Sequence, residues 1–253
     1  MPAKPDRAVI SALQERVRSL EGGRYQGRSV LPFGLADIDR HLPGGGLALG
    51  ALHEVAGGAN GAVDGAAAAL FAAGIAARTK GKVLWCVTRQ DLFAPALAQA
   101  GLSPDRVIFV EAGDEKSVLA CFEEGLRHNG LGAVLGELAR LPMTASRRLQ
   151  LAAETSSGIG IAIRRWRRHA DATDFGQPTA SVTRWRVSVL PSRPLPVPGV
   201  GRARWRLELI RCRGAESADF EVEACDGKGR LAVPSAMADG SPQKEIGRRI
   251  IAA

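Results

Sequence analysis

The stretch Ala51-Leu52-His53-Glu54-Val55-Ala56 decides the fold, together with the glycine-rich segment 57–65 and the alanine-rich segment 66–77 that follow it. Residues 51–56 predict a strand, the glycines predict a turn, and the apolar residues 66–77 predict a helix. In such a unit the loop N–H groups and the helix N-terminus converge on phosphate. The stretch therefore raises the question of whether the chain binds a nucleotide.

The same alternation continues along the chain. Apolar runs predict strands at 82–88, 106–111, 132–135 and 158–163, with helices predicted between them at 92–100, 117–128 and 146–154. This order implies right-handed crossovers and a parallel sheet. From residue 182 onward the predicted strands 183–190, 203–213, 220–224 and 230–233 are too few for a separate sandwich. We therefore predict an α/β fold, with a mostly parallel sheet flanked by helices and extended by antiparallel strands in the C-terminal third.

Length and composition are those of a folded protein with one large or two small domains. The chain has 253 residues, of which 45% are hydrophobic and 24% charged. We expect a helix and linker in residues 1–29, a core in 30–233 and a tail in 234–253 that is a candidate partner-binding segment. No secretion signal and no apolar run of bilayer length occur, so a cytoplasmic protein without membrane contact is expected. Four cysteines too widely spaced for a Cys-x-x-Cys pair predict free thiols: Cys86, Cys121, Cys212 and Cys225.

The glycine-rich loop lacks the cation that nucleotide binding needs. A Walker loop ends in Lys followed by Ser or Thr, which bind the phosphates and magnesium. Counting from Gly57 or from Gly58 puts no Lys there, no Lys or Arg occurs in residues 57–77, and Asp64 would repel phosphate. We therefore predict no ATP hydrolysis and no cofactor, with weak nucleotide binding by the loop amides left open. The residues of this degenerate phosphate loop are Gly57, Gly58, Gly61 and Asp64.

The remaining candidates for chemistry do not form a catalytic group. Glu137 follows an apolar strand, where an acid could hold magnesium, but an ordinary strand-end carboxylate is the preferred interpretation. The histidines are isolated in sequence, and His169 lacks a second His or Cys at ligand spacing. The sequence thus predicts neither catalytic residues nor a metal site.

The positive charge is concentrated in residues 164–213. Twelve arginines face only three acids there, which accounts for the whole surplus of +8. The strand period sends Trp185 and Trp205 to the face opposite the neighbouring arginines, so both are predicted to lie in the core in preference to stacking on bases. The run 164–169, after a strand, is predicted to contact nucleic acid or nucleoprotein, with docking of an acidic protein patch or a solvated rim as the alternatives. The candidate binding residues are Arg164, Arg165, Trp166, Arg167, Arg168, Arg184, Arg186, Arg204 and Arg206.

Several motifs resemble those of the ImuA family over nearly the whole chain. They include Leu42-Pro43-Gly44-Gly45-Gly46-Leu47, Ala145-Ser146-Arg147-Arg148-Leu149, Asp174-Phe175-Gly176-Gln177-Pro178-Thr179 and Arg202-Ala203-Arg204-Trp205-Arg206. The resemblance implies a RecA-like fold without a working Walker lysine and damage-inducible (SOS) expression. It also implies a non-catalytic accessory role in translesion synthesis and mutagenesis, beside ImuB and an error-prone replicative-type polymerase.

The resemblance leaves further partners and other functions open. RecA and single-stranded DNA are additional candidate partners. The segment that would match the first DNA-binding loop of recombinases is reduced to residues 138–144, which argues against strand exchange. A DNA-dependent ATPase or recombinase and a SulA-like inhibitor of cell division are the alternative functions.

Overall fold

The computed structural model describes residues 28–166, 175–192, 199 and 201–234, together with Ala12, Leu13 and Arg16. The predicted N-terminal helix lies outside this range except for those three residues, which are helical, and so does the predicted tail from residue 235 onward. None of the described helices is long and apolar enough to span a bilayer. The four cysteines are free thiols, as predicted, and Cys86 and Cys212 are buried.

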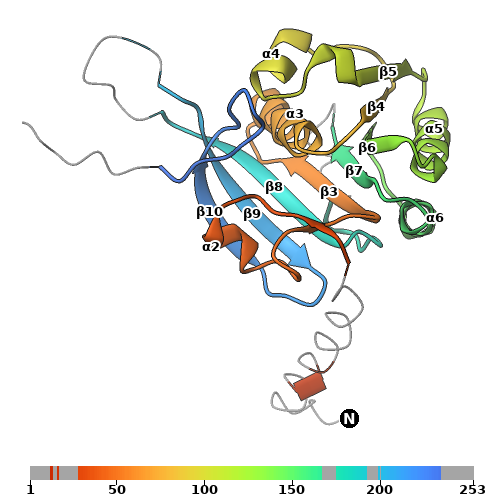
Figure 1. Cartoon of the computed structure of the whole chain (residues 1–253), viewed down its shortest axis with the longest axis horizontal. Helices are drawn as coiled ribbons and strands as arrows, with labels where there is room; N and C mark the ends of the chain where they lie inside the picture. Colours follow the sequence, from red (N-terminus) through yellow and green to blue (C-terminus); the bar gives the residue numbers. More distant parts are fainter. Residues whose placement is uncertain are drawn as a thin grey trace, which may run out of the picture.

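Helices and strands alternate along the first two-thirds of the chain, and strands alone follow (Figure 1). The elements are β1 (Val30–Leu31), α2 (Ala36–Asp39), β2 (Leu47–Ala48), β3 (Ala51–Gly57), α3 (Gly61–Ala77), β4 (Lys82–Val87), α4 (Ala94–Gln99), the 3₁₀ turn η1 (Pro104–Arg106), β5 (Val107–Glu111), α5 (Glu115–Arg127), β6 (Leu131–Leu138), α6 (Met143–Glu154), β7 (Ile159–Arg164), β8 (Thr183–Leu190), β9 (Arg204–Cys212) and β10 (Ala218–Glu223).

Eight strands form the central sheet in the order β10-β9-β8-β3-β7-β6-β4-β5. The strands from β3 to β7 pair in parallel, as the alternation predicts. The expectation for the C-terminal strands needs one correction, because β8 pairs in parallel with β3 and only the β8–β9 and β9–β10 pairs are antiparallel. A crossover from β7 to the far side of β3 produces this direction. The predicted strand 230–233 is reduced to one bridge between Glu223 and Ala232.

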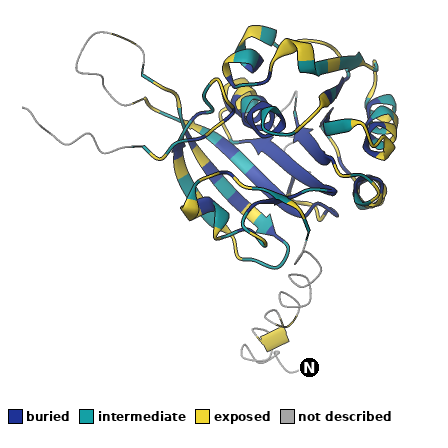
Figure 2. Ribbon diagram, in the orientation of Figure 1, coloured by how far each residue is buried: buried dark blue, intermediate teal, exposed yellow. Residues whose placement is uncertain are grey.

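Helices cover both faces of the parallel part of the sheet. The apolar side chains of α3 and the segment around α2 pack on one face, with Phe71 and Ile38 buried there. The helices α5 and α6 pack on the other face through residues such as Phe122 and Leu149. Every residue of β3 and β7 is buried, whereas in β9 buried residues alternate with intermediate or exposed ones over most of the strand (Figure 2). A sheet covered on both faces at its centre and on one face at its C-terminal end explains both sequence patterns.

The helix after the glycine loop starts earlier than the sequence predicts. Propensity places its first residue at 66 because glycines weaken helices, but α3 begins at Gly61 and leaves only residues 58–60 as the loop. Gly61 has φ +53°, a conformation that glycine adopts without strain. Tertiary contacts of Asp64, described below, stabilise this first turn.

Candidate functional site

The degenerate phosphate loop lies where β3 ends and α3 begins, and its carboxylate is turned inward. Asp64 is 2% exposed. Its Oδ2 accepts a hydrogen bond from the Asn60 N–H at 2.9 Å, and its Oδ1 accepts one from the Val189 N–H of β8, also at 2.9 Å. The Asp64 carboxylate therefore occupies a loop N–H group, that of Asn60, which in a nucleotide-binding loop would donate to a phosphate.

The loop glycines allow close packing around this carboxylate. A Cβ atom on Gly57 would lie 2.7 Å from the backbone carbon of Asp64. A Cβ atom on Gly58 would lie 2.2 Å from the Ser188 Oγ and 2.6 Å from the Asp64 Oδ2. These two glycines are thus needed for the contact between β3, α3 and β8.

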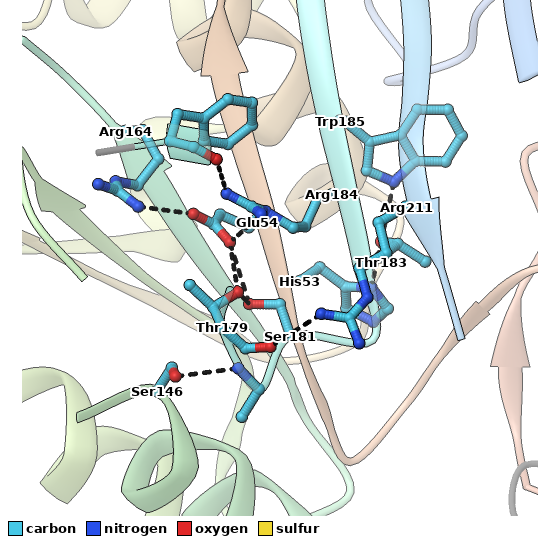
Figure 3. Close-up of polar contacts among 12 residues, drawn as sticks. His53, Glu54, Ser146, Arg164, Thr179, Ser181, Thr183, Arg184, Trp185 and Arg211 are labelled. Carbon is cyan, nitrogen blue, oxygen red and sulfur yellow. Dashed lines mark hydrogen bonds and ion pairs between the residues drawn. The ribbon is translucent and has the colours of Figure 1, made fainter. Parts of the chain in front are cut away.

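A buried carboxylate, Glu54 of β3, gathers side chains from three segments that are distant in sequence (Figure 3). Its Oε1 accepts a hydrogen bond from the Arg164 Nη1 at 2.6 Å, and its Oε2 lies 3.0 Å from the Arg184 Nε. The Oε2 atom also accepts hydrogen bonds from the hydroxyls of Thr179 at 2.8 Å and Ser181 at 3.4 Å. The Glu54 cluster, formed by these five residues, anchors the segment that precedes β8.

The Glu54 cluster corrects the role predicted for two arginines. The side chain of Arg164 is 0% exposed and that of Arg184 is 6% exposed. A charge in the interior requires an opposite charge and hydrogen bonds. Glu54 supplies the opposite charge and accepts a hydrogen bond from Arg164, and the Phe175 carbonyl accepts one from Arg184. Arg164 and Arg184 therefore balance an internal charge and do not lie on a surface that could bind nucleic acid.

Arg165, the residue after the end of β7, joins a second ion-pair network. Its Nη1 lies 2.6 Å from a carboxylate oxygen of Asp91 and 2.6 Å from one of Glu137. Its hydrogen bond to Asp91 lowers the pKa of that carboxyl. Burial raises the pKa of Glu137, although Arg165 and the indole N–H of Trp85 act in the other direction. Glu137 is thus a partner of Arg165, and no cluster of metal ligands occurs among the described residues.

Trp166 is half-buried and held by polar and aromatic contacts. Its indole N–H donates a hydrogen bond to the Ala139 carbonyl at 3.0 Å, and its ring packs edge-on against Phe175 with 5.7 Å between centroids. The ring is therefore positioned by the fold. The neighbouring candidates Arg167 and Arg168 lie outside the described residues.

The arginines of the C-terminal strands are largely neutralised by acids of adjacent strands. Arg186 lies 3.5 Å from Glu208, and Arg204 lies 2.8 Å from Glu221. Arg206 is exposed and has no ion pair within the described part of the chain. Trp185 and Trp205 are 0% and 2% exposed and belong to the core, as predicted.

Two cavities share the edge of the sheet at which the parallel strands end. One, of about 620 Å³, lies between the phosphate loop, α3 and the segment that leads into α4. The other, of about 420 Å³, lies beside Glu137 and the N-terminus of α5. Four residues line both cavities: Arg89, Asp91, Arg165 and Trp166.

Sequence reasoning did not identify the acids that organise this region. In the sequence, Glu54 belongs to a predicted strand and has no predicted role of its own. A charged residue between apolar residues in a strand is nevertheless a sign of a buried ion pair. Thr179 and Ser181 carry no local signal, because their partner lies more than 120 residues away. Asp91 could have been noticed only from its position just after a strand.

Comparisons with known proteins agree with this architecture. The chain is 40% identical over 215 residues to Protein ImuA from each of two strains of Caulobacter vibrioides, an alignment that covers 81% of this chain and 87% of the relative. No family model matches it. The crystal structure of the RadB recombinase superposes with a TM-score of 0.53 at 18% identity, covering 81% of this chain and all of the recombinase. The predicted RecA-like α/β fold is thereby confirmed, and the chain belongs to the ImuA family.

Proposed function

We propose that this protein is a non-catalytic, RecA-like accessory factor of damage-induced translesion DNA synthesis. In this role it acts in the cytoplasm beside ImuB and, through it, an error-prone replicative-type polymerase, and it contacts single-stranded DNA and RecA. Membership of the ImuA family supports the process. The observation that supports the absence of catalysis is Asp64, whose carboxylate accepts the loop N–H of Asn60 where an ATPase would bind phosphate.

An ATPase assay tests the non-catalytic part of the proposal. Phosphate release from ATP is measured with purified full-length protein, magnesium and single-stranded DNA, beside RecA as a positive control. We expect no release above the rate of a buffer blank, because the loop has an internal anion and lacks a lysine. The proposal would be contradicted by a DNA-stimulated ATPase activity that co-purifies with the parent protein and is absent from the Asp64→Ala variant.

A second experiment tests the nucleic-acid contact. The structure assigns Arg164 to the interior, so the predicted contact now rests on Arg165 and on the undescribed Arg167 and Arg168. Anisotropy of a labelled 20-nucleotide single strand is measured over a series of NaCl concentrations for the parent protein and for the double variant Arg167→Ala/Arg168→Ala. We expect weaker binding and a salt slope that is shallower by about 0.7 for each lost phosphate contact.

The matched control for this experiment is Arg206→Ala, which removes an exposed arginine from the open face of β9. If the double variant binds DNA like the parent and Arg206→Ala binds it more weakly, the DNA contact lies on the sheet and not at residues 167–168. No binding by the parent protein would remove DNA from the proposal.

The partner claim is tested with ImuB itself. Tagged ImuB from the same organism is used to capture the full chain and a chain that ends at residue 234, with both proteins at known concentration. Capture of the full chain supports the partnership, and loss in the shortened chain assigns the contact to residues 235–253. Absence of capture for both chains would exclude direct binding to ImuB.

A further inference from the structure

The larger cavity at the sheet edge is an apolar groove, here called the α3–α4 groove. Its walls are formed by Ala62, Ala66 and Leu70 of α3 and by Leu92, Phe93 and Ala96 at the start of α4. Phe93 is 71% exposed, although it is a large aromatic residue. Its exposure beside a cavity of about 620 Å³ is the kind of apolar surface that proteins use for binding.

The groove lies where a nucleotide would bind, but its chemistry does not fit one. The anion-binding end is filled by the Asp64 carboxylate, which accepts the Asn60 N–H. The α3 residues that face the groove are small and apolar and provide no cation. A triphosphate there would lie close to a buried carboxylate without a compensating charge.

The charges along the groove fit one carboxylate better than a chain of phosphates. Three arginines line it: Arg89, Arg164 and Arg165. Arg164 is neutralised by Glu54, and Arg165 by Asp91 and Glu137. Arg89 is exposed and forms no salt bridge with the described residues. Its charge helps to lower the pKa of Asp91, whose hydrogen bonds go to Arg165, so the Arg89 guanidinium is available for a ligand. A nucleic-acid backbone requires several such cations, whereas one carboxylate requires one.

We propose that the α3–α4 groove is a docking site for a partner protein segment that presents an apolar side chain next to a carboxylate. The apolar side chain packs against Phe93 and the alanines of α3, and the carboxylate pairs with Arg89. An exposed aromatic residue beside an arginine is the composition that contributes most to binding at protein interfaces. Arg164, Arg165 and Trp166 form one side of the groove, so the proposal is tested through Phe93 and Arg89, which lie outside residues 164–168 and 235–253, where the proposed function places its DNA and partner contacts.

A phage-displayed library of random 12-residue peptides, selected on the immobilised full-length protein, tests the proposal. The consensus peptide is then synthesised with a fluorescent label, and its binding is measured by anisotropy to the parent chain, to Phe93→Ser and to Arg89→Glu. We expect a consensus with an aromatic or aliphatic residue within four positions of Asp or Glu. Each groove variant is expected to bind it at least tenfold more weakly.

Matched controls come from the exposed face of α6, far from the groove in sequence. Leu151→Ser removes an apolar residue that is 62% exposed, and Arg147→Glu reverses an exposed charge. Both are expected to bind the consensus peptide like the parent. A charge exchange gives a readout that misfolding cannot mimic, since a peptide with Lys in place of its acid should bind Arg89→Glu more tightly than it binds the parent.

Three results would overturn the proposal. The first is a selection without a shared motif, and the second is a consensus peptide whose binding is unaffected by Phe93→Ser or Arg89→Glu. The third is a tenfold loss of single-stranded DNA binding in both groove variants, which would assign the groove to nucleic acid. The proposed function is tested separately by the ImuB and Arg167/Arg168 experiments, so failure of one leaves the other standing.

Discussion

Glu54 is the residue whose environment depends most on the rest of the fold. It is fully buried, and the two arginines that pair with it come from the ends of β7 and β8. A buried ion pair of this kind adds little net stability compared with apolar residues, but removing one partner leaves the other charges uncompensated. The cluster is therefore expected to be intolerant of single substitutions.

We predict that Glu54→Ala lowers the free energy of unfolding by about 3–5 kcal/mol, because Arg164 and Arg184 would remain buried without a counter-charge. Urea unfolding followed by circular dichroism measures this change. The matched control is Glu221→Ala, whose side chain is 50% exposed and pairs with Arg204 on the surface. It should cost less than about 1 kcal/mol. Equal costs for the two variants would show that the Glu54 pairs do not hold the segment before β8.

His53, the neighbour of Glu54, is buried in a defined tautomer. Its Nε2 lies 2.9 Å from the Ala48 carbonyl, which can only accept, so this nitrogen carries the proton. The Nδ1 atom then accepts a hydrogen bond from the Thr183 hydroxyl, with 2.7 Å between Nδ1 and Oγ1. Burial lowers the pKa of His53 to about 4, although the hydrogen bond to Ala48 acts in the opposite direction.

This lowered pKa gives a pH dependence of stability. The unfolded chain binds a proton on His53 near pH 6.5 and the folded chain only near pH 4, so stability is complete above pH 6.5 and falls as the pH drops toward 4. We predict that protonation of His53 in the unfolded chain lowers the free energy of unfolding of the parent by roughly 2 kcal/mol when the pH is lowered from 7.5 to 5. The difference in unfolding free energy between parent and His53→Gln, measured in urea at both pH values, should shrink by that amount. A constant difference would contradict the lowered pKa.

At the scale of elements, glycines decide how closely helices and turns approach. Gly101 ends α4 with φ +93°, and a Cβ atom on it would lie 2.2 Å from the backbone nitrogen of Gly229. The turn that contains Gly229 follows Cys225, whose Sγ would lie 2.2 Å from a Cβ atom on Gly74 of α3. This turn therefore packs against both α3 and the end of α4 only because glycines occupy the contact points.

We predict that Gly101→Ala lowers the melting temperature much more than Gly113→Ala does. Gly113 has φ +81°, and no atom lies within 4 Å of a Cβ added to it. Gly113→Ala should therefore lower the free energy of unfolding only by the cost of placing alanine in the left-handed region, about 1–2 kcal/mol. Gly101→Ala adds a backbone clash to the same cost. Thermal unfolding of the two variants and the parent isolates the clash, and similar melting temperatures would mean that the turn moves away freely.

At the scale of the molecule, one hydrophobic core joins the α/β part to the C-terminal strands. Phe71 of α3 packs against Trp185 of β8 and Trp205 of β9, with ring centroids 5.9 and 6.4 Å apart. The strand β8 also pairs directly with β3 at the centre of the sheet. The strands β8, β9 and β10 are therefore part of the structural unit that carries the phosphate loop.

We predict that a chain ending at residue 181 does not fold, whereas a chain ending at residue 234 unfolds like the full protein. Without β8 the central strand β3 would lose a neighbour and Phe71 would lose both tryptophans. Tryptophan fluorescence and far-ultraviolet circular dichroism during urea unfolding should give one coincident transition for the longer chain. A cooperative transition in the chain ending at 181 would indicate two independent units.

The candidate site could be predicted from the sequence only in part. The missing lysine of the phosphate loop is visible because a Walker loop is a contiguous motif. The concentration of arginines in residues 164–213 is equally visible, but their availability is not. Glu54 pairs with Arg164 and Arg184 in the interior, and Glu221 of β10, which lies outside that segment, pairs with Arg204.

The sequence alone determined the α/β alternation, the absence of a cation from the phosphate loop and the placement of Trp185 and Trp205 in the core. These features follow from local periodicity and contiguous motifs, which neighbouring residues along the chain specify. Only the tertiary structure decided the direction of β8, the early start of α3 and which arginines are buried. Each of these depends on a partner more than 100 residues away, such as Val189 for Asp64 or Glu54 for Arg164, and pairings at that distance leave no periodic trace in the sequence.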